Sequence, residues 1–197
     1  MDLSRINTKQ FLINEDYLKK LEGSYVLPED SGEIKNLVMT ADSYSLSANE
    51  YIGALITFLR NLNPNSKITI ISPFSKDQIK KYIIDSKLIS EDELNKLEYK
   101  LNPIQVNYGP TIWARDFLQV FVNYQGNKEE ITTAKPNRNP VYELRPDKQV
   151  AKTLSDNLGT KYGELKNFPM AGGNTIATKK HLFVGMYALK QAKEYYN

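Results

Sequence analysis

The sequence predicts an α/β protein with parallel strands, because strand-like and helix-like segments alternate along its first half. Residues 34–40 are a candidate buried strand, and residues 67–72 form a second run that is rich in β-branched side chains. Between them, Ser47 is a candidate cap for a helix over residues 48–61. Apolar residues recur there at helical spacing: Tyr51, Leu55, Phe58, Leu59 and Leu62. Short strand–helix–strand links of this kind favour a parallel arrangement.

Two further helices are predicted in the middle of the chain, over residues 75–86 and 90–99. Ser90 and Glu93 have the spacing of a capping box, in which each side chain binds the other residue's backbone N–H. After these helices we expect a strand that carries the chain to Trp113.

Residues 125–146 are polar and contain Pro and Asn, which predicts a loop. We interpret it mainly as a solvated connection, and a specificity loop at the mouth of a pocket is the alternative. Asp147 then starts a predicted helix that reaches Leu158 and that Gly159 ends. Residues 163–168 are the strand expected next.

The domain is expected to span residues 34–197, preceded by a polar lead over residues 1–33. Within this lead, residues 14–22 are a candidate short helix that Gly23 could terminate. Residues 28–32, which run from Pro28 to Gly32, are a candidate linker.

The composition is that of an ordinary globular domain, with 41% hydrophobic and 25% charged residues. The net charge is only +3 and the basic residues are interspersed with acids, which argues against a nucleic-acid partner. No segment has the length or apolar character of a signal peptide or a membrane span, so we expect a cytoplasmic protein. Without Cys, and with a single His, the sequence predicts neither a disulfide scaffold, a metal site nor a cofactor.

Two short motifs suggest a pocket for a guanidinium group: Trp113-Ala114-Arg115-Asp116 and, downstream, Gly172-Gly173-Asn174. A carboxylate can accept two parallel N–H bonds from this planar cation while an aromatic ring covers its face. Asp116 and Trp113 are candidates for these two roles. Asp42 is a further candidate, because it follows the first predicted strand, where α/β proteins tend to place site residues.

Each motif also has a structural interpretation. A lone Trp is more often a core anchor, and an Arg-Asp pair is more often a surface pair. A Gly-Gly-Asn sequence most often forms a tight turn. The two motifs together favour the functional interpretation, above all for Asp116.

Over roughly residues 103–185 the sequence resembles the guanidino-group-modifying enzymes of the pentein fold, an α/β-propeller built from ββαβ repeats. These include agmatine deiminases, arginine deiminases and bacterial peptidylarginine deiminases. Residues 104–123 are similar to the strand, Trp-x-Arg-Asp, strand block of those enzymes. Residues 150–158, 168–174 and 182–185 are similar to their helix, strand, Gly-Gly-Asn, strand block.

The resemblance implies a hydrolase that acts on a guanidino C–N bond of agmatine, arginine or peptidyl-arginine. It implies that Asp116 holds the guanidinium in catalysis, and that Trp113, Arg115, Gly172, Gly173 and Asn174 contribute to substrate binding. It also implies that a Cys thiolate attacks the guanidinium carbon, assisted by a His in an H-x-D segment.

The sequence departs from this family at several positions. Ala171 stands where the family has an acidic or small polar residue, and Leu118-Gln119 replaces a frequent Gly-Pro. The chain has no Cys, and its one His, His181, is not in an H-x-D context and is interpreted as structural.

A pentein ring has five repeats, and 197 residues leave room for about three. We therefore expect an incomplete ring, which a second chain or a missing C-terminal segment could complete. The interpretation that we favour is an N-terminal fragment of a deiminase, which is inactive alone. The alternatives are a noncatalytic module that binds a guanidino compound or an arginine-containing peptide, and an interaction protein without a small-molecule role.

Overall fold

The computed structural model of the chain describes residues 24–26, 34–112, 118–125, 128–136, 146–165, 175–177 and 182–184. Within these ranges the strands form three sheets, in the orders β2-β3-β4, β1-β5-β6-β7 and β8-β9. The predicted helix at residues 14–22 and the linker at 28–32 lie outside them.

The three-stranded sheet is parallel, as the sequence predicts. It consists of β2 (Asn36–Thr40), β3 (Lys67–Ser72) and β4 (Leu101–Gln105). Strand β3 lies in the middle, and every residue in it after Lys67 is buried. The run of β-branched side chains therefore predicts this strand correctly, and its observed bounds are the predicted ones.

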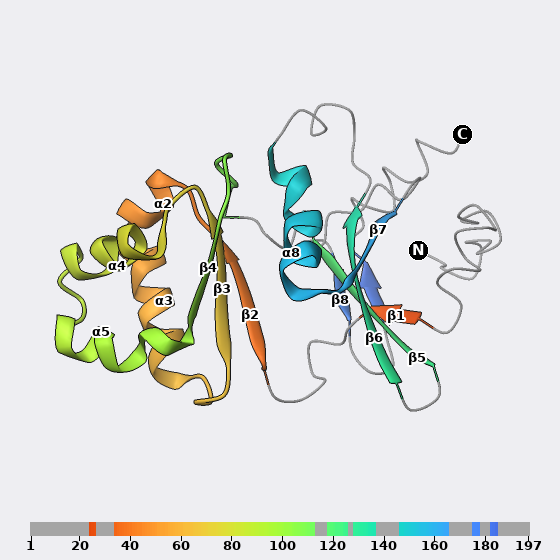
Figure 1. Ribbon diagram of the computed structural model, residues 1–197, viewed down its shortest axis with the longest axis horizontal. Helices are drawn as coiled ribbons and strands as arrows, with labels where there is room; N and C mark the ends of the chain where they lie inside the picture. Colours follow the sequence, from red (N-terminus) through yellow and green to blue (C-terminus); the bar gives the residue numbers. More distant parts are fainter. Residues whose placement is uncertain are drawn as a thin grey trace, which may run out of the picture.

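Helices α3 (Asn49–Asn61), α4 (Lys76–Asp85) and α5 (Glu91–Leu97) lie together on one side of this sheet (Figure 1). The spacing of apolar residues in α3 brings Ile52, Leu55, Ile56 and Leu59 to its buried side. They pack against Ile68 and Ile70 of β3 and form the larger of two cores.

The start of α3 differs from the prediction. Ser47 does not cap it; Ala48 is the N-cap and makes no side-chain capping bond. Ser47 instead ends a separate short helix, α2 (Ser43–Ser47), where its hydroxyl donates to the Ser43 carbonyl at 2.8 Å. Two helices follow each other here, and Asp42 caps the first of them.

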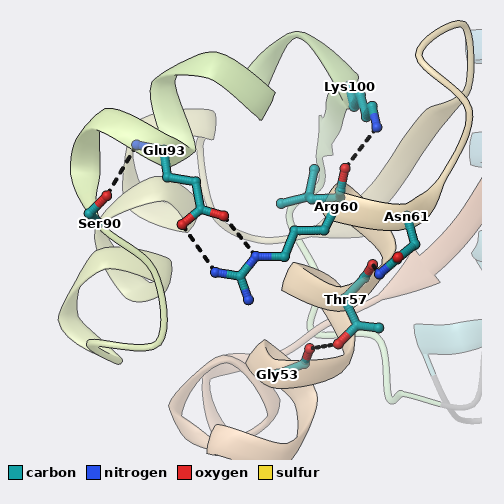
Figure 2. A network of polar contacts seen from close by, with 8 residues as sticks. Gly53, Thr57, Arg60, Asn61, Ser90, Glu93 and Lys100 are labelled. Atoms are coloured by element: carbon teal, nitrogen blue, oxygen red, sulfur yellow. Dashed lines mark hydrogen bonds and ion pairs between the residues drawn. The ribbon is translucent and has the colours of Figure 1, made fainter.

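The capping box is complete at α4 and half formed at α5. At α4, the Gln78 N–H donates to Ser75 Oγ, and Gln78 Oε1 accepts from the Ser75 N–H at 2.9 Å. At α5, the Glu93 N–H donates to Ser90 Oγ at 3.2 Å, but the Glu93 carboxylate accepts from Arg60 at 2.7 and 3.1 Å (Figure 2). A charged partner on α3 thus takes the carboxylate that the capping box would use.

The four-stranded sheet contains a hairpin and a parallel strand. Strands β5 (Gln119–Gln125) and β6 (Lys128–Pro136) are antiparallel, and β7 (Lys161–Leu165) runs parallel to β6. Strand β1 (Ser24–Val26) pairs with β5 on the outer side. With helix α8 between β6 and β7, this chain order is one ββαβ unit.

The loop predicted over residues 125–146 is wrong in its first part, because β6 occupies residues 128–136. The β-branched Ile131, Thr132 and Thr133 pair with β5, and this tertiary partner overrides the polar composition. Strand β7 also begins two residues before the predicted start at Gly163.

Helix α8 (Val150–Leu158) follows a short 3-10 turn over Pro146–Gln149, and β8 (Thr175–Ala177) and β9 (Leu182–Val184) form the two-stranded sheet. Gly159 ends α8 at a φ of 66°, a left-handed conformation that glycine adopts without strain. Helix α8 stands between the two larger sheets (Figure 1). Its residues Val150, Ala151 and Leu154 form the second core, to which both sheets contribute.

Lys100 is buried to 3% exposure beside the C-terminal end of α3. Its ammonium donates to the carbonyls of Leu59 and Leu62, both at 2.7 Å, and the bond to a backbone oxygen is visible in Figure 2. These carbonyls have no partner within the helix, and a cation at this end also interacts favourably with the helix dipole.

We predict that Lys100→Met lowers the free energy of unfolding by about 2–3 kcal/mol, because it removes two charge-assisted bonds and leaves buried carbonyls unpaired. Urea denaturation followed by circular dichroism measures this change. Lys96→Met, at an exposed position of α5, is the matched control and should change stability by less than about 0.5 kcal/mol. Equal stability of the two variants would show that Lys100 does not cap α3.

Candidate functional site

The carboxyl ends of the three parallel strands meet at one edge of their sheet. Thr40 ends β2, Ser72 ends β3 and Gln105 ends β4. The register aligns these ends, since Thr40 pairs with Ile71 and Ser72 pairs with Gln105. In α/β proteins this edge is the usual position of ligand sites.

Thr111, six residues beyond β4, is held at this edge through both of its backbone polar groups. Its N–H donates to Asp147 Oδ1 at 2.6 Å, and its carbonyl accepts from the hydroxyl of Thr40. One partner ends strand β2 and the other lies in the turn before α8. Three segments that are distant in the sequence therefore meet at Thr111.

Asp147 is 1% exposed, which is unusual for a carboxylate. Its Oδ1 accepts from Thr111, whereas its Oδ2 is buried without a hydrogen-bond partner among the described residues. The hydroxyl of Thr111 is in the same state. Among the described residues, the interior beside Thr111 thus contains two polar atoms without partners, and a functional role is one explanation for such atoms.

Tyr108 lies near this carboxylate and contacts α8. Its hydroxyl is 2.9 Å from Thr153 Oγ1. Burial raises the pKa of Tyr108, the hydrogen bond with Thr153 lowers it, and the negative charge of Asp147 raises it further, so that the net shift is upward. Tyr108 thus remains a neutral phenol. Its hydrogen bond with Thr153 connects the segment between β4 and Thr111 to α8.

Tyr51 of α3 supports Thr40 from the other side. Its hydroxyl donates to the Thr40 carbonyl at 3.1 Å. Burial raises the pKa of Tyr51 strongly, and the charge of Asp42 adds to the shift. The tyrosine stays protonated and keeps its donor, and Thr40 is fixed at its carbonyl and at its hydroxyl.

Asp42 is located where the sequence predicts, just beyond the carboxyl end of β2, and it is the N-cap of α2. Its Oδ1 accepts from the backbone N–H of Ser45 at 2.8 Å and from the Ser45 hydroxyl at 2.5 Å. Burial by itself raises the pKa of Asp42, but the bonds from Ser45 outweigh it and lower the pKa. These contacts give Asp42 a structural role.

The predicted substrate residues lie largely outside the described part of the chain. This holds for Trp113, Arg115 and Asp116 and for Gly172, Gly173 and Asn174. His181, which the sequence analysis interprets as structural, also lies outside it. The structure does describe the residues on both sides of the first motif. Thr111 is anchored as above, and Ile112 is 48% exposed.

On the far side of that motif, Leu118 is buried to 8% exposure in the core that α8 shares with both sheets. The chain therefore enters the motif from an anchored backbone at Thr111 and leaves it into a packed core at Leu118. The residues that flank 113–117 are thus held by contacts with the sheet edge on one side and with the core around α8 on the other.

Sequence reasoning missed Thr40, Thr111 and Asp147 as members of the site. Asp147 marks a helix start in the sequence, and an Asp there usually caps its own helix. Its actual partner, Thr111, is 36 residues away in the chain. No local pattern carries that information. The one sequence signal for Thr111 is its position two residues before Trp113.

Within the described ranges, no group of three or more His, Cys, Asp or Glu residues has the arrangement of a metal site. The helices of the same ranges include none that is long and apolar enough to cross a membrane.

A scan of the sequence against models of protein families finds no match. A search of curated proteins by sequence also finds none. The fold is similar to solved structures of agmatine deiminases. A C. jejuni agmatine deiminase matches with a TM-score of 0.58 at 14% identity, over 85% of this chain and 48% of that one.

A Cys-to-Ser variant of the C. jejuni enzyme with substrate bound matches with a TM-score of 0.51 at 15% identity, over 77% of this chain and 42% of that one. The chain thus spans less than half the length of these enzymes. At this level of identity, the likeness establishes a mixed α/β fold with a parallel sheet, similar to that of agmatine deiminases.

We predict that Asp42→Ala lowers the free energy of unfolding by about 1 kcal/mol at pH 7, because the cap of α2 is lost. Asp42→Asn should be close to wild type there, because Asn caps equally well. Folding lowers the pKa of Asp42 below its ordinary value of 3.8. Its charge therefore stabilises the fold at any pH above 3.8, and this stabilisation is lost as the pH falls through the pKa of the folded state.

The Asn variant should therefore lose less stability than wild type below pH 3.8. Urea denaturation at pH 7 and at acidic pH measures both effects. If Asp42→Ala is as stable as wild type at pH 7, Asp42 does not cap α2. Substrate binding would then be the better explanation for an Asp at this position.

Proposed function

We propose that this chain forms the guanidinium-binding part of a hydrolase that removes ammonia from a guanidino group. The observation that carries the proposal is the similarity of its fold to agmatine deiminases over most of this chain. The anchoring of Thr111 at the carboxyl edge of the parallel sheet supports it, because the Trp113 to Asp116 motif follows immediately. The fragment interpretation of the chain belongs to the same proposal.

In the proposed site, the carboxylate of Asp116 accepts two parallel N–H bonds from the guanidinium, and the indole of Trp113 packs against its face. Arg115 contributes to binding. The Gly172-Gly173-Asn174 sequence lets the backbone approach the substrate, because glycine has no side chain to obstruct it. Asp42 is assigned to the rim of the site, because it follows Thr40 at the same sheet edge.

A small guanidino compound is the substrate class that we favour, because one of the similar agmatine deiminases was solved with substrate bound. Agmatine, free arginine and peptidyl-arginine share the same reacting group. The reaction adds water to the guanidinium carbon and releases ammonia, so that a ureido group remains.

The covalent step requires a nucleophile that these 197 residues do not contain, since they include no Cys. We assign that step to residues beyond this chain, in the same polypeptide or in a second one. These residues would also complete the ring of ββαβ repeats, of which β5, β6, α8 and β7 form one. Outer strands such as β7 would then gain a neighbour.

The absence of Cys favours one alternative, a noncatalytic module that binds a guanidino compound or an arginine-containing peptide. Such a module would use Asp116 and Trp113 in the same way but would release no ammonia. Ligand binding and turnover therefore separate the two functions.

We predict that the protein binds agmatine and that Asp116→Asn weakens this binding at least tenfold, because the substitution removes the negative charge and replaces one of the two accepting oxygens by an NH2 group that cannot accept. Isothermal titration calorimetry measures the affinity. Putrescine, which carries an amine in place of the guanidino group, is the control ligand. Asp156→Asn, on the exposed side of α8, is the control variant and should bind as wild type does.

Ammonia release from agmatine by the complete protein, lost by orders of magnitude in Asp116→Asn, would support the deiminase. Selective binding without ammonia release would favour the noncatalytic module. Equal binding of agmatine and putrescine, or an unchanged affinity in Asp116→Asn, would exclude a guanidinium site at this motif.

A further inference from the structure

Thr111 makes two backbone hydrogen bonds to side chains, one to Thr40 and one to Asp147. We propose that Asp147 and Thr40 form a clamp that positions the segment entering Trp113 and Asp116, and that both are positioning residues for the guanidinium site. The part that concerns the site rests on the proposed function. The clamp itself is defined by contacts among described residues.

Thr111 lies outside any helix or strand, and the backbone groups of such residues commonly bind water. Here both groups bind side chains that are themselves buried, since Thr40 and Asp147 are each 1% exposed. The two partners are 71 and 36 residues away in the sequence. The position of Thr111 is therefore set by the interior of the domain and not by its own loop.

Each half of the clamp is held in turn by a packed element. Thr40 is the last residue of strand β2, and its carbonyl accepts from the hydroxyl of Tyr51 of α3. Asp147 precedes α8, whose buried side contacts both larger sheets. A shift of α8 against the parallel sheet would thus be transmitted to Thr111, because its two bonds lead to opposite sides of that interface.

The chemistry of Asp147 fits a positioning role better than a stabilising one. A buried carboxylate is costly to desolvate, and Oδ2 has no partner in the described ranges to compensate for it. The bond from the Thr111 N–H to Oδ1 is short, at 2.6 Å, as charge-assisted bonds are. The carboxylate therefore fixes the backbone of Thr111, while its own burial lowers the stability of the fold.

Position matters because Asp116 is only five residues beyond Thr111 in the sequence, which is the basis for expecting a displacement of Thr111 to affect binding. A displacement of about 1 Å at a reacting centre can reduce a rate about a hundredfold. Neither clamp residue needs to contact the substrate to have this effect.

Amide hydrogen exchange at Thr111 tests the clamp directly, because this N–H is the donor to Asp147. We expect exchange to be at least tenfold faster in Asp147→Ala and clearly faster in Thr40→Val. Asp147→Asn and Thr40→Ser keep the acceptor and the hydroxyl, and they should remain within threefold of wild type. Thermal unfolding shows whether each variant is folded.

Two control variants separate the clamp from general destabilisation. Thr69→Val removes a buried hydroxyl from β3 of the same sheet, where Thr69 bonds Asn36 and Asn102. Asp156→Ala removes an exposed carboxylate that pairs with Lys152. Both should leave exchange at Thr111 as in wild type. Wild-type exchange at Thr111 in Asp147→Ala and in Thr40→Val alike would overturn the clamp.

The second measurement is the affinity for agmatine in the same variants. We expect it to fall at least tenfold in Asp147→Ala and Thr40→Val and to be restored in Asp147→Asn and Thr40→Ser. Faster exchange with an unchanged affinity would overturn the positioning role. If wild type binds no guanidino compound, the proposed function fails, and hydrogen exchange alone decides whether the clamp exists.

Discussion

Helix α8 packs between the two larger sheets, and its buried residues Val150, Ala151 and Leu154 contact side chains from both. The parallel sheet contributes Ile71 and Ile104 to this core. Leu118, the residue just before β5 of the second sheet, also belongs to it. The interface fixes the start of α8 close to the carboxyl edge of the parallel sheet. Asp147 reaches Thr111 only because of this packing.

The same packing defines both ends of the motif that the sequence singles out. Thr111 is bound at the sheet edge before it, and Leu118 is buried against α8 after it. The residues that flank the motif are therefore held by the core of the domain. In general, a binding site gains affinity when its surroundings are fixed before the ligand arrives.

Asp147 differs from the apolar interior of the rest of the domain. The larger core of the domain is apolar and well satisfied, from Ile52 and Leu59 of α3 to Ile70 of β3. At the edge of the sheet, by contrast, a carboxylate is buried with one oxygen unpaired among the described residues. Local violations of packing rules of this kind tend to occur where function constrains the structure.

The sequence alone determined the elements whose signals are local. The β-branched run at residues 67–72 gives β3 without error, and Gly159 ends α8 in the left-handed conformation that glycine favours. The parallel arrangement of β2 and β3 follows from the helical segment and the short links between them. The likeness to agmatine deiminase folds, which the Trp113 and Gly172 motifs suggest, is also a feature that the sequence reveals.

Only the tertiary structure decided which distant residues meet. Strand β6 forms in a polar stretch because β5 supplies its hydrogen bonds, and Glu93 leaves its capping box because Arg60 of another helix offers a charged partner. The sequence predicts that a helix starts at Asp147, yet the Asp147 carboxylate accepts from the backbone N–H of Thr111, 36 residues away. Local propensity acts within a few residues, whereas these choices depend on contacts that exist only once the sheets and α8 have packed.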